Sequence, residues 1–108
     1  MSAPLATVVS LAPYRMPRLD GLSVLVRGER VELDGVSARL FAEALLWAHQ
    51  AGARGQVAGI TVTEARGGIH LELPGGALGL LPRKLVVTWI EVLHQRAELL
   101  PRRLGGAS

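Results

Sequence analysis

The sequence predicts an α+β fold in the order β-β-α-β-β-α, in which a four-stranded antiparallel sheet carries two helices packed on one face. Two segments alternate apolar and polar residues around a short turn, and a segment with helical periodicity follows each of them. The length of 108 residues suits a single domain. We expect an arm over residues 1–20, the domain over 21–101 and a flexible, basic and glycine-rich tail over 102–108.

The composition excludes several kinds of function. Without cysteine the chain has no disulfide, no thiolate metal site and no thiol nucleophile. The net charge is +3, but the 12 basic residues are scattered, and all of them except Lys84 are arginine. No apolar run approaches the roughly 18 residues of a membrane span, and no export signal is evident. We therefore expect a cytoplasmic protein.

The first 20 residues contain Pro4, Pro13 and Pro17, so any regular structure there is short. Two interpretations remain open: a flexible leader, or an apolar strap laid over a neighbouring subunit. The strap would use Val8, Val9, Leu11 and Tyr14.

A first hairpin is predicted from apolar alternation over Leu22–Val26 and Val31–Leu33. Gly28-Glu29 suits a two-residue type II′ turn between these strands. Asp34 or Ser37 can then accept the free amide hydrogens at the start of the next helix.

That helix is predicted over Val36–Ala53, with Gly52 at its end. Arg39, Glu43 and Gln50 form one narrow polar stripe, which Leu46 interrupts. Apolar residues cover nearly all of the remaining circumference. The helix therefore carries more apolar surface than one thin sheet needs, and the excess indicates a partner.

A second hairpin is predicted from Ile60–Thr63 and Ile69–Leu73, with Gly67-Gly68 in the turn. Arg66-Gly67 also matches Arg27-Gly28 of the first hairpin, which leaves an internal duplication open. A last helix is predicted between Pro82 and Pro101. Its polar face contains Lys84, Thr88, Glu91, Gln95 and Glu98.

Two pairs of residues resemble chemical sites. Glu91 and His94 have a spacing that metal-binding bundles use, but a di-metal site needs a second such pair and two more carboxylates. His70 and Glu72 share one side of a strand and could form an acid-base pair, but an exposed strand face offers no pocket. We therefore predict no metal, no cofactor and no enzymatic activity.

The leading hypothesis is a non-enzymatic protein-interaction module, a regulator, adaptor or assembly factor, that forms a homodimer or binds another protein through apolar helix surface. The predicted contact residues are Leu25, Phe41, Leu46 and Trp47. The alternative interpretation is that all four belong to the core.

A second hypothesis is a small DNA-binding protein that uses its C-terminal helix and tail. The candidate residues are Arg83, Lys84, Arg96, Arg102 and Arg103. Salt separates the two hypotheses, because affinity for DNA falls steeply with ionic strength whereas an apolar interface is nearly insensitive to it.

Overall fold

A computed structural model of the protein describes residues 16–107, and the surroundings of side chains from residue 16 to residue 98. The elements in chain order are β1 (Arg18–Asp20), β2 (Ser23–Val26), β3 (Glu29–Glu32), α2 (Gly35–Ala51), β4 (Gly55–Val57), β5 (Ile60–Ala65), β6 (Gly68–Glu72), β7 (Leu78–Pro82) and α3 (Arg83–Ala107). The α+β class and its two helices are confirmed. The order differs from the predicted one, because β1, β4 and β7 are added.

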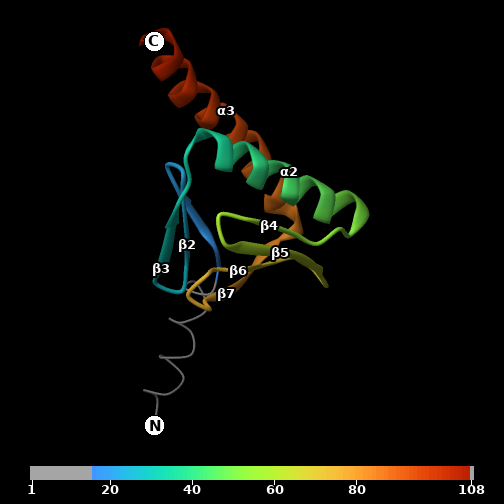
Figure 1. Ribbon diagram of the computed structural model, residues 1–108. Coiled ribbons are helices and arrows are strands. Elements are labelled where there is room, and N and C mark those ends of the chain that lie inside the picture. The colour runs from blue at the N-terminus through green and yellow to red at the C-terminus, as the bar shows by residue number, and fades with distance from the viewer. Residues whose placement is uncertain (1–15, 108) are drawn as a thin grey trace.

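The strands form two antiparallel sheets instead of the single predicted sheet. One has the order β1-β2-β3 and the other the order β4-β5-β6-β7. Figure 1 shows the small sheet standing apart from the larger one. The reason lies in the strands that the sequence prediction missed. β4 pairs with β5, and β7 pairs with β6, so both edges of the second hairpin are occupied by neighbouring chain and none is left for the first hairpin.

Both hairpin turns lie one residue earlier than predicted. In the first hairpin Val26 pairs with Glu29, so the turn consists of Arg27 and Gly28, both with positive φ (49° and 88°). Positive φ at both positions is the type I′ geometry, which matches the twist of the strands. In the second hairpin Arg66 and Gly67 form the turn, and Gly68 belongs to β6.

Gly68 is needed for a close approach between backbones. A Cβ atom at this position would collide with the carbonyl oxygen of Leu81 on the neighbouring strand. The glycine that the sequence prediction placed in the turn therefore serves β6–β7 packing instead.

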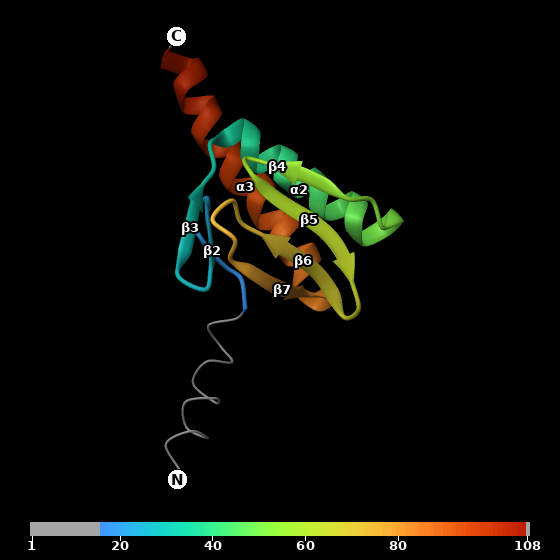
Figure 2. The same ribbon diagram turned by 60° about the horizontal axis from the view of Figure 1, so that its bottom comes forward.

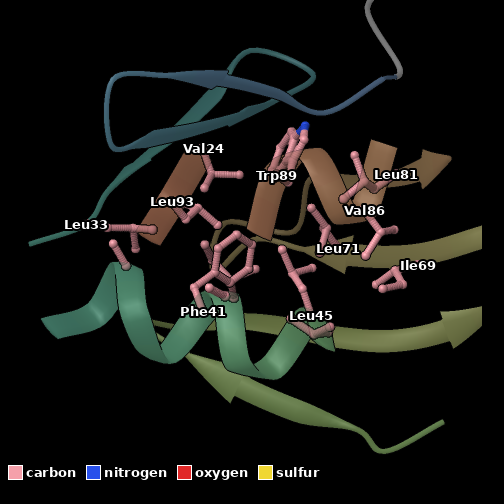
Figure 3. Packing of buried hydrophobic residues seen from close by; sticks show 14 of the residues in the cluster. Val24, Leu33, Phe41, Leu45, Ile69, Leu71, Leu81, Val86, Trp89 and Leu93 are labelled. Atoms are coloured by element: carbon pink, nitrogen blue, oxygen red, sulfur yellow. The ribbon is translucent and has the colours of Figure 1, made fainter. Parts of the chain in front are cut away.

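The core lies between the larger sheet and the two helices. α2 and α3 pack against each other, α2 contacts β4, β5 and β6, and α3 contacts β6 and β7 of the larger sheet. Figure 2 shows that sheet in front with both helices behind it. Buried side chains from both helices and both sheets form one cluster, part of which is drawn in Figure 3. The largest of them are Phe41, Leu45, Ile60, Ile69, Leu71, Leu73, Leu81 and Leu93.

Polar contacts attach the small sheet to the rest of the domain. The Glu29 carboxylate, at the start of β3, accepts hydrogen bonds from the backbone amides of Gly75 (2.6 Å) and Ala77 (3.1 Å) in the loop between β6 and β7. The Arg96 guanidinium on α3 donates to the carbonyl oxygen of Gly21 (2.6 Å) in the turn between β1 and β2. The hairpin is therefore held at both of its ends.

The ends of the chain add two observations. β1 lies within the stretch 1–20 for which the sequence predicts an arm, and it pairs with β2 from Arg18 to Asp20. α3 continues past Pro101, the predicted end of the helix, because a proline removes one hydrogen bond of a helix without forbidding the turns that follow. The predicted strap of Val8, Val9, Leu11 and Tyr14 lies outside the described residues. Within the described part of the chain, no helix combines the length and the apolar character needed to cross a membrane.

Candidate functional site

The outward face of α2 carries three large apolar side chains that are exposed to solvent. Val36, Leu40 and Trp47 are 64%, 50% and 57% exposed. At 100° per residue, the three positions fall within a sector of about 40° around the helix axis. They lie along one side of the helix and form what we call the α2 stripe.

Specific residues fix both ends of α2. The Asp34 side chain accepts a hydrogen bond from the backbone amide of Ser37 (2.7 Å), as an N-cap residue does. The backbone amide and hydroxyl of Ser37 favour the charged carboxylate and lower the pKa of Asp34. At the other end Gly52 has φ 67° and its amide bonds back to the carbonyl oxygen of Ala48. The stripe is therefore displayed on a helix with defined ends.

The opposite face of α2 is fully used inside the domain. Phe41 and Leu45 are completely buried, and so are the small residues Ala38, Ala42 and Ala48. The Phe41 ring lies 6.5 Å from the Trp89 ring of α3, tilted by 59°. The prediction of Phe41 as a contact residue is therefore wrong, because the helix turns this side chain towards α3 and the larger sheet.

The other three predicted contact residues have different surroundings. Trp47 belongs to the α2 stripe. Leu46 is half-buried on the same helix. Leu25 is also half-buried, but it lies on β2, where its strand neighbours are Arg18 and Arg30. The structure therefore places these residues on two different elements.

The sequence prediction omitted Val36 and Leu40 from the contact residues. They precede Trp47 by eleven and seven residues, which places all three on one side of a helix. That periodicity was available in the sequence. It could not indicate which apolar line faces the core, because nearly the whole circumference of α2 is apolar.

Two charged residues border the α2 stripe on one flank. Arg39 and Glu43 are both exposed. Among residues 16–98, neither of them forms an ion pair or a hydrogen bond through its side chain. A cation and an anion are therefore both available beside the apolar line.

The residues considered for catalysis and metal binding are spread over open surface. His70 and Glu72 are exposed on the outer face of the larger sheet. His70 borders a shallow groove of about 370 Å³ between Arg27 and β7, and Glu72 is not among the residues that line it. Glu91 and His94 are exposed on α3. Within the described residues, no three histidine or carboxylate side chains lie close enough to hold a metal ion.

The basic residues of the DNA hypothesis are distributed along α3. Arg83 and Lys84 are exposed at its first turn. Arg96, about 20 Å further along at 1.5 Å per residue, is engaged with the carbonyl oxygen of Gly21. The side chains of Arg102 and Arg103 lie outside the described part of the helix. DNA binding by these residues stays a prediction.

Comparison with known proteins adds no assignment: no protein-family model, no curated protein and no solved structure matches the chain.

Proposed function

We propose that the protein is a non-enzymatic interaction module of the cytoplasm, a regulator, adaptor or assembly factor, which forms a homodimer through the outward face of α2. The observation that supports this proposal is the α2 stripe of Val36, Leu40 and Trp47, which is at least half exposed at each position. Exposed apolar side chains gathered on one face mark interaction sites more often than scattered single ones do.

Burial of the stripe would favour association. Burial of apolar surface contributes roughly 25 cal/mol per Å², and aromatic residues at the centre of an interface commonly dominate its energy. Trp47 is the largest of the three side chains. The fold itself does not require the stripe, since the opposite face of α2 supplies the contacts with α3 and the larger sheet.

A charged residue within the stripe tests the proposal. We expect wild-type protein to sediment as a monomer–dimer equilibrium, and Leu40→Glu to weaken the dimer by at least about tenfold, because the dimer would have to bury an unpaired carboxylate. The measurement is sedimentation equilibrium over a range of protein concentrations. Circular dichroism checks that the variant remains folded.

Val87→Glu is the matched control. Val87 is 50% exposed, as Leu40 is, but it lies on α3. This variant is expected to associate as wild type does. A wild-type protein that stays monomeric at every concentration, or a dimer that Leu40→Glu leaves intact, would contradict the proposal.

A further inference from the structure

The charges beside the α2 stripe determine how a second copy can be arranged. Arg39 and Glu43 lie one helical turn apart on the same flank, exposed and without a partner among residues 16–98. Burying either charge at an interface without an opposite charge is costly. A second copy that covers the stripe is therefore favoured where it supplies an anion for Arg39 and a cation for Glu43.

We propose that the second copy packs α2 against α2 in antiparallel orientation, with the two-fold axis level with residues 41–42, so that Arg39 of each copy faces Glu43 of the partner subunit. This proposal rests on the homodimer proposed above and adds its orientation and register.

The symmetry of an antiparallel helix pair favours this contact. A two-fold axis perpendicular to both helices brings the same flank of each helix together, as in antiparallel coiled coils. Residues whose numbers add to about 83 then lie at the same level. Arg39 and Glu43 add to 82, so the axis creates two equivalent ion pairs beside the apolar line.

The same register also matches the apolar residues. Val36 lies level with Trp47 of the partner subunit, and the two copies of Leu40 lie close to the axis. Both ends of the stripe are then covered by a large side chain from the other copy. The exposed faces of Val36 and Trp47 are therefore hidden together.

A parallel pair does not satisfy these groups. A two-fold axis parallel to the helices sets the flank with Arg39 and Glu43 against the opposite flank of the partner subunit. At 100° per residue that flank carries Ser37 and Ala44, so neither charge meets an opposite charge. The parallel pair also aligns the two helix dipoles in the same direction, which is the less favourable arrangement. In the antiparallel pair each charge faces an opposite charge, and the two helix dipoles point in opposite directions.

The size of the contact predicts a moderate affinity. α2 has 17 residues and is therefore about 26 Å long. One helix face of this length lies at the low end of the interface sizes that give stable complexes. We expect a dissociation constant on the order of micromolar, within the range of analytical ultracentrifugation.

Charge reversal tests the orientation. Arg39→Glu places two carboxylates at each contact, and Glu43→Arg places two guanidinium groups there, so each variant alone should dimerise at least about tenfold more weakly than wild type. An equimolar mixture of the two variants pairs Glu at position 39 with Arg at position 43, and the double variant R39E/E43R inverts both pairs. Both should return to within about threefold of the wild-type dissociation constant.

Lys84→Glu and Glu91→Arg provide the control for net charge. Both residues are exposed on the outer face of α3, and the two substitutions change the charge of the chain by the same amounts. Each variant alone should associate as wild type does.

The outcomes separate this proposal from the one on which it rests. If Leu40→Glu abolishes the dimer while Arg39→Glu and Glu43→Arg leave it unchanged, the orientation is wrong and the α2 interface stands. A mixture no tighter than either variant alone also overturns the orientation. If Leu40→Glu has no effect, the α2 interface itself is wrong.

Discussion

The two helices of this domain have similar inward faces and very different outward faces. Both bury apolar residues in one shared cluster, to which α2 contributes Phe41 and Leu45 and α3 contributes Val86 and Leu93. Outside, α2 exposes the stripe of large apolar side chains, whereas α3 exposes mainly polar ones up to residue 98. The exposed residues of α3 are Arg83, Lys84, Val87, Thr88, Glu91, His94, Gln95 and Glu98.

This difference shows which apolar residues the fold requires. A single row of buried side chains is enough to hold α3 on this sheet. The second apolar line of α2 is therefore surplus to the fold, and we attribute it to binding.

The largest expected effect on stability comes from truncating a buried side chain on the inward face of either helix. Phe41→Ala removes a completely buried ring that adjoins Trp89, and should lower the free energy of unfolding by about 3–5 kcal/mol. Leu93→Ala, its counterpart on α3, should cost about 2–5 kcal/mol. Urea denaturation followed by circular dichroism measures both. A cost below about 1 kcal/mol for Phe41→Ala would mean that the inward face of α2 is not part of the core.

A smaller effect on stability concerns Glu29, whose hydrogen bonds attach the small sheet to the loop between β6 and β7. Glu29→Ala removes the acceptor for the amides of Gly75 and Ala77, and should destabilise the domain by about 1–2 kcal/mol, because these bonds are charged but partly exposed to water. Glu32→Ala on the same strand is the control. Its contact with Arg30 is long (3.8 Å) and exposed, so a change within about 0.5 kcal/mol is expected. Equal urea midpoints for the two variants would refute a bridging role for Glu29.

The smallest expected effect on stability concerns the N-terminus of α2, which is capped differently from that of α3. Asp34 caps α2, whereas α3 follows β7 directly and its first amide, of Arg83, bonds to the carbonyl oxygen of Gly67 (3.0 Å). Folding lowers the pKa of Asp34, so its stabilising contribution is complete above the unfolded pKa of about 3.9 and is lost as pH falls through the folded pKa.

Thermal unfolding as a function of pH measures this contribution. Asp34→Ala should lower Tm by a few degrees at neutral pH, and the difference from wild type should shrink as the solution is acidified. Asp34→Asn keeps a capping oxygen but not the charge, so its Tm at neutral pH should lie between those of Asp34→Ala and wild type. An undiminished difference between Asp34→Ala and wild type at low pH would show that the carboxylate charge has no part in the cap.

Much of the fold could be predicted from periodicity. The α+β class, both helices and the end of α2 at Gly52 follow from local patterns, which also narrow the N-cap to Asp34 or Ser37. The pairing of strands could not be predicted in the same way. β1 and β4 have three residues each, too few for a periodic signal, and β7 includes Gly79 and Pro82, residues that strands disfavour.

The candidate site was predictable in kind and only partly in its residues. An excess of apolar surface on the central helix follows from the sequence, and Trp47 belongs to it. Phe41 and Leu40 are adjacent in the sequence, and only the packing against α3 makes one of them core and the other surface. A helix that is apolar on most sides does not reveal its orientation.

The fluorescence of Trp47 as a function of protein concentration tests the α2 interface most directly. Trp47 is 57% exposed and Trp89 only 7% exposed, so changes in solvent exposure are reported mainly by Trp47. Raising the concentration through the expected micromolar range should shift the emission of wild-type protein to shorter wavelength and reduce quenching by acrylamide, while Trp47→Phe shows neither change. Emission and quenching that stay constant across that range, in a sample whose mass shows a dimer, would place the interface elsewhere.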